Sequence, residues 1–193
     1  MNIGDGPSRP HAATGSDVPI VVMGVSGSGK SSVAAALARR IGADFVEADD
    51  YHSAENRAKM ARATPLTDTD RAPWLDRVGR AIGEHTVQGR AVVVSCSALR
   101  RSYRDRLRSE SGADLFFVEL TGDEGTLARR LESRRDHFMP RALLDSQLAT
   151  LEHLEGDEQG MTADFGQPID RIVGTVIGNL RNASASPNRL SPI

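Results

Sequence analysis

Residues 24–31 read GVSGSGKS and match the phosphate-loop pattern G-x-x-x-x-G-K-S. An apolar, β-branched run precedes the loop at residues 19–23 and is typical of a buried parallel strand. Apolar residues then recur at helical spacing over residues 33–41, and Gly42 is placed to end that helix. A strand, a glycine-rich turn and a helix in this order predict an α/β fold with an anion-binding loop.

The loop predicts a nucleotide ligand, because glycines let successive backbone N–H groups point at phosphate oxygens and the following helix adds its positive end. Lys30 is expected to reach the β- and γ-phosphates, and Ser31 is expected to hold Mg²⁺. The predicted ATP-binding residues are Gly24, Val25, Ser26, Gly27, Ser28, Gly29, Lys30, Ser31 and Ser32.

The length and composition are typical of a soluble globular protein of one domain. A chain of 193 residues can bury a sizeable core. Its termini, at residues 1–17 and 183–193, are rich in small and polar residues and are predicted to be disordered tails, so that a single domain spans residues 18–182.

Charge and cysteine content narrow the expected partners. A net charge of −2 offers no basic excess, so we expect neither nucleic acid nor a membrane surface as a partner. There is no apolar stretch long enough to span a membrane, and the N-terminus lacks the apolar core of a signal peptide. The single cysteine, Cys96, fits a reducing compartment, and we expect a cytoplasmic protein.

Strands and helices alternate along the rest of the chain, which predicts a parallel sheet covered on both faces. One helix is expected to be capped by Ser53 and another to begin near Asp70 with Pro73 in its first turn. Further strands are predicted at 43–48, 91–94, 115–120 and 161–165, and helices at 56–63, 103–108, 124–133, 140–148 and 169–180.

Asp49 is the principal candidate for acid–base chemistry. It follows the second predicted strand, which we expect to lie beside the strand of the phosphate loop, and ligands bind beyond the carboxyl ends of such strands. It could accept the proton of an acceptor hydroxyl, help to place Mg²⁺, or cap the next helix, although Asp50 suits the capping role better.

The third predicted strand ends in Ser95, Cys96 and Ser97 and carries no carboxylate there. Many phosphate-loop enzymes hold their metal through an Asp at this point. Metal organisation should then rest on Ser31 and, through water, on the pair Glu47 and Asp49. Cys96 is expected to be a small packed residue.

A basic stretch near residues 134–140 predicts a lid over the phosphates. Arginine forks suit phosphate oxygens, and closure excludes water that would hydrolyse the nucleotide. Arg134 is the first choice for this role, whereas Arg129 and Arg130 could equally lie on the solvated surface. His137 is expected to pack the lid or to contact the substrate.

Lysine is rare in this chain: of 24 basic residues only Lys30 and Lys59 are lysine. Lys30 is explained by the phosphate loop, where a compact ammonium differs from a planar guanidinium. Lys59 is either a second position where arginine fails or an ordinary surface lysine.

Several further segments resemble the gluconate kinases, a family of phosphate-loop kinases. The resemblance runs from about residue 19 to residue 180 and rests on five blocks in order. They are MGVSGSGKS at 23–31, ADDYHSAENRAKM at 48–60, PLTDTDRAPWL at 65–75, CSALRRSYRDRLR at 96–108 and HFMP at 137–140.

The resemblance implies a three-layer phosphate-loop kinase fold with a five-stranded parallel sheet and a lid, as in shikimate and nucleoside monophosphate kinases. It implies transfer of the ATP γ-phosphate to the 6-hydroxyl of D-gluconate, often by a homodimer. It also implies that the catalytic residues are Asp49, Lys30 and Arg134. The residues expected to contact the acceptor are Asp49, His52, Arg57, Lys59, Ser97 and His137.

Two residues depart from the family pattern: Glu47 stands where an Asp is expected, and Asp136 replaces a usual glycine. Two other readings remain open at this point. One is a related kinase acting on shikimate or another sugar acid, and the other is a catalytically idle nucleotide-binding module. A GTPase is disfavoured, because the chain contains no N-K-x-D string for guanine.

Overall fold

The structure is a computed structural model that describes residues 18–132 and 141–185. Helices and parallel strands alternate through these residues. In chain order the elements are β1 (Ile20–Met23), α1 (Lys30–Ile41), β2 (Asp44–Glu47), the 3₁₀ turn η1 (Ala48–Tyr51), α2 (Ala54–Ala61), α3 (Asp68–Val87), β3 (Val92–Ser95), α4 (Arg101–Ser111), β4 (Phe116–Thr121), α5 (Glu124–Glu132), α6 (Arg141–Thr150), β5 (Gly160–Asp164) and α7 (Ile169–Ala185).

The five strands form one parallel sheet in the order β2-β3-β1-β4-β5. The predicted parallel sheet is therefore confirmed. The expectation that β2 lies beside β1 was wrong, because β3 pairs with both and separates them: Val94 is opposite Val21 on one side and Val46 on the other. The phosphate loop thus follows the central strand, and Asp49 follows the edge strand.

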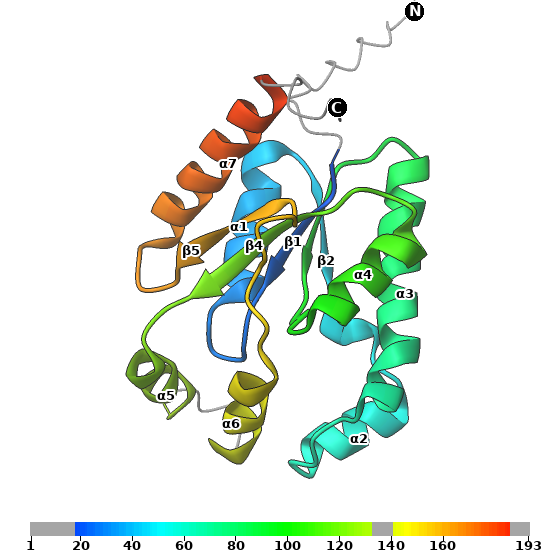
Figure 1. The fold of residues 1–193 in the computed structure, drawn as a ribbon, viewed down its shortest axis with the longest axis vertical. Coiled ribbons are helices and arrows are strands. Elements are labelled where there is room, and N and C mark those ends of the chain that lie inside the picture. The colour runs from blue at the N-terminus through cyan, green and yellow to red at the C-terminus, as the bar shows by residue number, and fades with distance from the viewer. Residues whose placement is uncertain (1–17, 133–140, 186–193) are drawn as a thin grey trace, which may run out of the picture.

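Helices cover both faces of the sheet, and Figure 1 shows α1 and α7 on one face and α3 and α4 on the other. Alternate residues of β1 enter the two cores: Ile20 and Val22 pack on the α1 side, and Val21 and Met23 pack on the α3 side. All four are at most 1% exposed, which explains why this strand reads as a continuous apolar run. The helices α2, α5 and α6 lie beyond the carboxyl ends of the strands (Figure 1).

The helix predicted near Asp70 begins earlier, at Asp68. Thr67 is its N-cap, and the Thr67 and Asp70 side chains each accept a hydrogen bond from the backbone N–H of the other, at 3.2 and 2.9 Å. This capping box fixes the start of α3. Pro73 therefore lies beyond the first turn, contrary to the prediction.

Other boundaries follow the predictions closely. Gly42 adopts φ 71° and ends α1, with its N–H on the Ala38 carbonyl, and Ser53 caps α2 through a 3.1 Å bond from the Asn56 N–H. The last helix continues past its predicted end to Ala185. The predicted lid near 134–140 lies outside the described residues. No helix in residues 18–132 and 141–185 has the length and apolarity needed to cross a membrane.

Candidate active site

The phosphate loop joins β1 to α1 at the centre of the sheet. Its three glycines, Gly24, Gly27 and Gly29, all have positive φ, at 140°, 82° and 93°. At Gly24 a Cβ would also lie 2.9 Å from the Leu120 carbonyl oxygen, so a side chain there would clash with β4. These positions therefore require glycine for conformation, and at Gly24 also for space.

Two donors of the loop are hydrogen-bonded to acceptors within the protein, and a third is buried without a partner in the described part of the chain. Lys30 Nζ donates to the Val25 carbonyl at 3.0 Å, and the Ser26 N–H donates to Gln147 Oε1 at 2.7 Å. Ser28 is 1% exposed, and its hydroxyl has no hydrogen-bond partner among the described residues. A buried polar atom without a partner is costly, so this loop fits an anionic ligand that would supply acceptors.

The predicted Mg²⁺ ligand, Ser31, lies at the start of α1 beside the end of β3. Its Oγ lies 3.4 Å from Ser95 Oγ, and Ser95 is paired in register with Glu47 of β2. No group of three His, Cys, Asp or Glu side chains in the described part of the chain could hold a metal by itself. A serine hydroxyl of the phosphate loop, with an acidic residue on the neighbouring strand, fits Mg²⁺, which usually keeps several waters and takes its other ligands from substrate phosphates.

On the acceptor side, Asp49 lies in η1 and its side chain is 74% exposed. Asp49 Oδ1 is 3.9 Å from His52 Nε2. The His52 ring stacks on Trp74, with centroids 4.4 Å apart, and Trp74 Nε1 donates to the Ala48 carbonyl at 2.7 Å. Trp74 is therefore a core residue that fixes both η1 and the imidazole.

The pKa of His52 is lowered, chiefly because burial disfavours its charged form, although Asp49 acts in the opposite direction. The same ring is held by Asn56, whose Nδ2 lies 3.5 Å from His52 Nδ1 and also donates to the Asp70 carbonyl at 2.8 Å. A neutral imidazole of fixed orientation can donate or accept a hydrogen bond to a polyol hydroxyl.

The two predicted cations of α2 are already engaged. Arg57 Nη1 donates to the His52 carbonyl at 2.5 Å, and Lys59 Nζ lies 2.7 Å from Asp70 Oδ1. The hydrogen bond from Lys59, with further bonds from Thr67, lowers the pKa of Asp70 to about 2. Lys59 is therefore paired with Asp70, a contact that the rarity of lysine in this chain did not predict.

Ser97 and Cys96 follow β3. The Ser97 carbonyl accepts from the Gly24 N–H at 3.4 Å and so links this strand end to the phosphate loop. Cys96 is 1% exposed, as expected of a packed residue. Burial raises the pKa of its thiol to about 12; the Asp49 carboxylate adds to this rise and the Lys30 ammonium opposes it.

Arg130 contacts the phosphate loop, a role that sequence reasoning left undecided. Its Nη1 donates to the Ser28 carbonyl at 3.4 Å and its Nη2 to the Phe165 carbonyl at 2.8 Å, while the guanidinium covers the Phe165 ring. Arg129 instead points to solvent and bonds to Thr126 of its own helix. Two predicted residues, Arg134 and His137, lie outside the described residues.

A second group that the sequence reasoning missed surrounds Tyr103 near the start of α3. Arg71 and Arg100 both lie over its ring, at 5.7 and 5.8 Å, and both pair with Asp68. Arg71 also contributes to the lowered pKa of His52. Arg71 and Asp68 lie in the block at 65–75, but their contacts to Tyr103 and Arg100 join residues more than thirty positions apart in the sequence.

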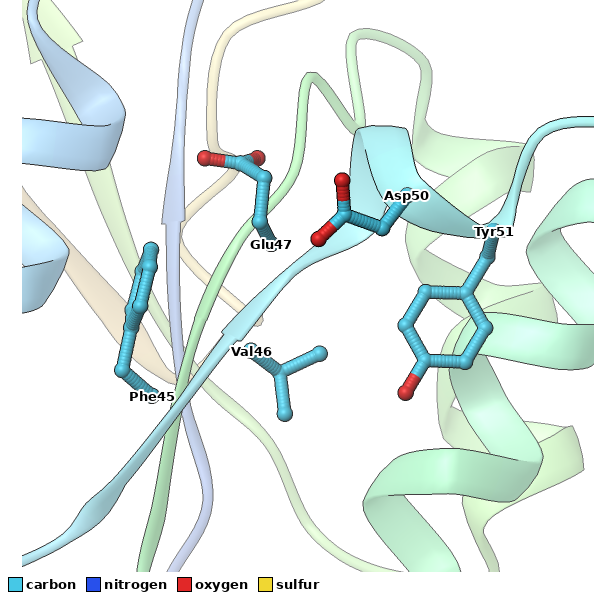
Figure 2. Close-up of a pocket in the computed structure, with 5 residues that line it drawn as sticks. All are labelled: Phe45, Val46, Glu47, Asp50 and Tyr51. Atoms are coloured by element: carbon cyan, nitrogen blue, oxygen red, sulfur yellow. The ribbon is translucent and has the colours of Figure 1, made fainter.

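A pocket of about 260 Å³ opens at the end of β2 and is lined by Phe45, Val46, Glu47, Asp50 and Tyr51. Figure 2 shows these side chains on β2 and η1, with Glu47 and Asp50 at the carboxyl end of the strand. The pocket includes neither Asp49 nor any residue of the phosphate loop, so it adjoins the predicted acceptor site without coinciding with it.

Comparison with known proteins agrees with this arrangement. A family model described as an AAA domain matches residues 20–154. The gluconokinase of Gluconobacter oxydans (strain 621H) is 49% identical over 154 residues, which cover 80% of this chain and 85% of that protein.

Solved structures give the same result. A gluconokinase from Sinorhizobium meliloti 1021 superposes with a TM-score of 0.77 at 48% identity and covers 88% of this chain and 94% of its own. The shikimate kinase of Aquifex aeolicus shares the fold with a TM-score of 0.55 at 13% identity, covering 88% of this chain and 99% of its own. With its phosphate loop on the central strand and its acidic η1 at the same sheet edge, the chain belongs to the gluconokinase family of phosphate-loop kinases.

Proposed function

We propose that this protein transfers the γ-phosphate of ATP to the 6-hydroxyl of D-gluconate and so makes 6-phospho-D-gluconate. The new bond joins O6 to the phosphorus as the bond to the β-phosphate oxygen breaks, and the hydroxyl proton passes to Asp49. The nucleotide leaves as ADP.

One observation supports this function above the others: an anion-binding loop and an ionisable pair, Asp49 and His52, follow strands of the same parallel sheet at the same edge. The strand β3 links the two: Ser31 Oγ lies 3.4 Å from Ser95 Oγ, and Ser95 is paired with Glu47, two residues before Asp49. Phosphoryl transfer needs this proximity, because its catalysis consists of aligning two substrates and neutralising charge.

The donor half is formed by the loop residues 24–32. Lys30 would leave the Val25 carbonyl to reach the β- and γ-phosphates. Mg²⁺ would be held by Ser31, by the phosphates and by waters shared with Glu47 and Asp49, and it would neutralise charge on the transferred group. Arg134 of the predicted lid would add a further cation.

The acceptor half extends from Asp49 to Lys59 and includes Ser97 and His137. Asp49 is exposed, and its ion pair with His52, at 3.9 Å, is the shortest it makes with any described residue. This suits a carboxylate that must meet a substrate hydroxyl. His52 would orient the polyol, and Arg57 and Lys59 would contribute positive charge to the binding of the substrate carboxylate.

A coupled assay tests this function. Purified protein with Mg-ATP is offered D-gluconate, shikimate and a panel of other sugar acids, and ADP release is followed. Gluconate-dependent ADP release is expected to exceed that with every other acid. Preference for another acid would keep the kinase and replace the acceptor, and nucleotide binding without any turnover would favour an idle binding module.

We further propose that one kinase domain spans residues 18–182, with a lid near 134–140 and tails at 1–17 and 183–193. The protein would act in the cytoplasm, as part of gluconate utilisation, as a homodimer. Sedimentation at micromolar concentration is expected to give twice the mass of 20.7 kDa. A species with the mass of one chain at that concentration would contradict the dimer.

A further inference from the structure

The side chain of Gln147 reaches the phosphate loop from α6, a helix remote from the loop in sequence. Its Oε1 accepts a hydrogen bond from the Ser26 N–H at 2.7 Å. Backbone N–H groups of such loops are the groups that cradle phosphate oxygens. A neutral amide oxygen therefore lies where an oxygen of the nucleotide would bind.

A second donor of the loop is also paired within the protein. Lys30 Nζ donates to the Val25 carbonyl at 3.0 Å, although this ammonium would serve the phosphates when nucleotide is bound. Ser28 Oγ is buried and has no partner in the described part of the chain. The loop therefore adopts an anion-binding conformation. Gln147 Oε1 supplies one of the two protein acceptors that stand in for phosphate oxygens.

The helix that carries Gln147 is anchored, so its side chain remains at the loop when phosphate arrives. Leu144 is 4% exposed and belongs to the core on the α1 side, where Leu148 and Leu151 also pack. Just beyond the helix, the Glu152 N–H donates to the Leu99 carbonyl at 2.7 Å. Movement of the whole helix would break this packing, whereas rotation of one side chain would not.

The geometry points to Gln147 as a direct ligand of the nucleotide phosphates. A phosphate oxygen displaces Oε1 from Ser26, and the carboxamide turns about its last torsion so that Nε2 donates to the phosphate. A carboxamide carries both an acceptor and two donors, and this torsion has broad, roughly two-fold wells. Among the described residues Nε2 has no other hydrogen-bond partner, so the turn breaks only the bond to Ser26.

The inference rests on the proposed function only in taking ATP and ADP as the ligands, and it is tested by equilibrium binding without any acceptor acid. Gln147→Ala is expected to weaken ATP and ADP binding about fivefold, because the bond lost to a charged phosphate exceeds the bond lost in the empty loop. Gln147→Glu is expected to weaken both at least tenfold, because a carboxylate keeps the contact to Ser26 and repels the phosphates. Adenosine, which has no phosphate, is expected to bind all variants equally.

Gln88→Glu is the matched control, because Gln88 is exposed at the far end of α3 and the change adds the same charge away from the loop. Unchanged or tighter ATP binding by Gln147→Ala would overturn the inference, and so would an equal loss for adenosine, which indicates a general structural defect. Lack of turnover with gluconate, with this binding pattern intact, would overturn the proposed acceptor alone.

Discussion

Replacing Glu158 by glutamine is expected to lower the free energy of unfolding by about 3 kcal/mol. Its carboxylate and the Arg104 guanidinium are both 0% exposed, and Arg104 donates to it through Nε at 2.8 Å and Nη2 at 2.6 Å. Burial raises the pKa of Glu158, but hydrogen bonds from Arg104 and Arg108 outweigh burial and lower the pKa from 4.5 to about 2. At about 1.4 kcal/mol per pKa unit this shift corresponds to about 3 kcal/mol, at the lower end of the ~3–5 kcal/mol typical of breaking a buried pair.

The same stabilisation should depend on pH in a defined direction. Because the folded-state pKa is the lower one, the contribution is complete above the ordinary pKa of 4.5 and disappears as the pH falls towards about 2. Urea unfolding followed by far-ultraviolet circular dichroism measures the difference between wild type and Glu158→Gln at pH 7 and pH 3. The difference is expected to shrink by more than half at pH 3.

Asp157→Asn provides the control, because Asp157 is 66% exposed and pairs with Arg101 at the surface. Exposed pairs contribute about 0–1 kcal/mol, so this variant should be close to wild type. A Glu158→Gln effect below about 1 kcal/mol, or one no larger than the control, would refute the buried-pair reasoning.

Three further outcomes are expected. Asp49→Asn should reduce turnover at least 10²-fold while leaving ATP affinity nearly unchanged, as measured by ADP release and nucleotide titration; wild-type rates would remove Asp49 as the base. Cys96, whose pKa burial raises to about 12, should resist thiol reagents at pH 8 until urea unfolds the protein, and rapid labelling of the native protein would contradict its burial. Gly79→Ala should destabilise the protein by about 1–3 kcal/mol in urea unfolding, because the new Cβ would lie 2.5 Å from Glu110 Cβ. Gly174→Ala, whose new Cβ would have no atom of the described residues within 4 Å apart from its own helix backbone and chain neighbours, should be neutral or stabilising by up to about 1 kcal/mol. Equal effects of the two changes would contradict the close approach of α3 to α4.

The local signals of this sequence were sufficient for most of the fold. The phosphate loop, the apolar strands and caps such as Ser53 depend on neighbouring residues, so their pattern predicts them directly. The position of β3 between β1 and β2 depends on how the crossovers pack, and no local pattern encodes it. The start of α3 at Asp68 was missed because Pro73 suggested a first turn, although Thr67 and Asp70 already formed a capping pattern.

The sequence predicted which types of residue form the candidate site, but it predicted fewer of the contacts that those residues make with other side chains. Asp49 and His52 lie together at the expected edge, whereas the ion pair between Lys59 and Asp70 required the structure. Gln147 was overlooked and the role of Arg130 was left undecided, because each contacts the phosphate loop from more than a hundred residues away in the sequence. Contacts of this kind follow from tertiary packing, and a single sequence gives no spacing by which to find them.

The stacking of His52 on Trp74 has a spectroscopic consequence. Trp74 is the only tryptophan of the chain, so all indole fluorescence arises next to the proposed acceptor site. A protonated imidazole quenches indole emission by electron transfer, whereas a neutral one quenches it weakly. Because burial lowers the pKa of His52, emission should stay high at neutral pH and fall only in acid. An acceptor that contacts His52, as proposed, would change that titration, and the indole emission would then report its binding.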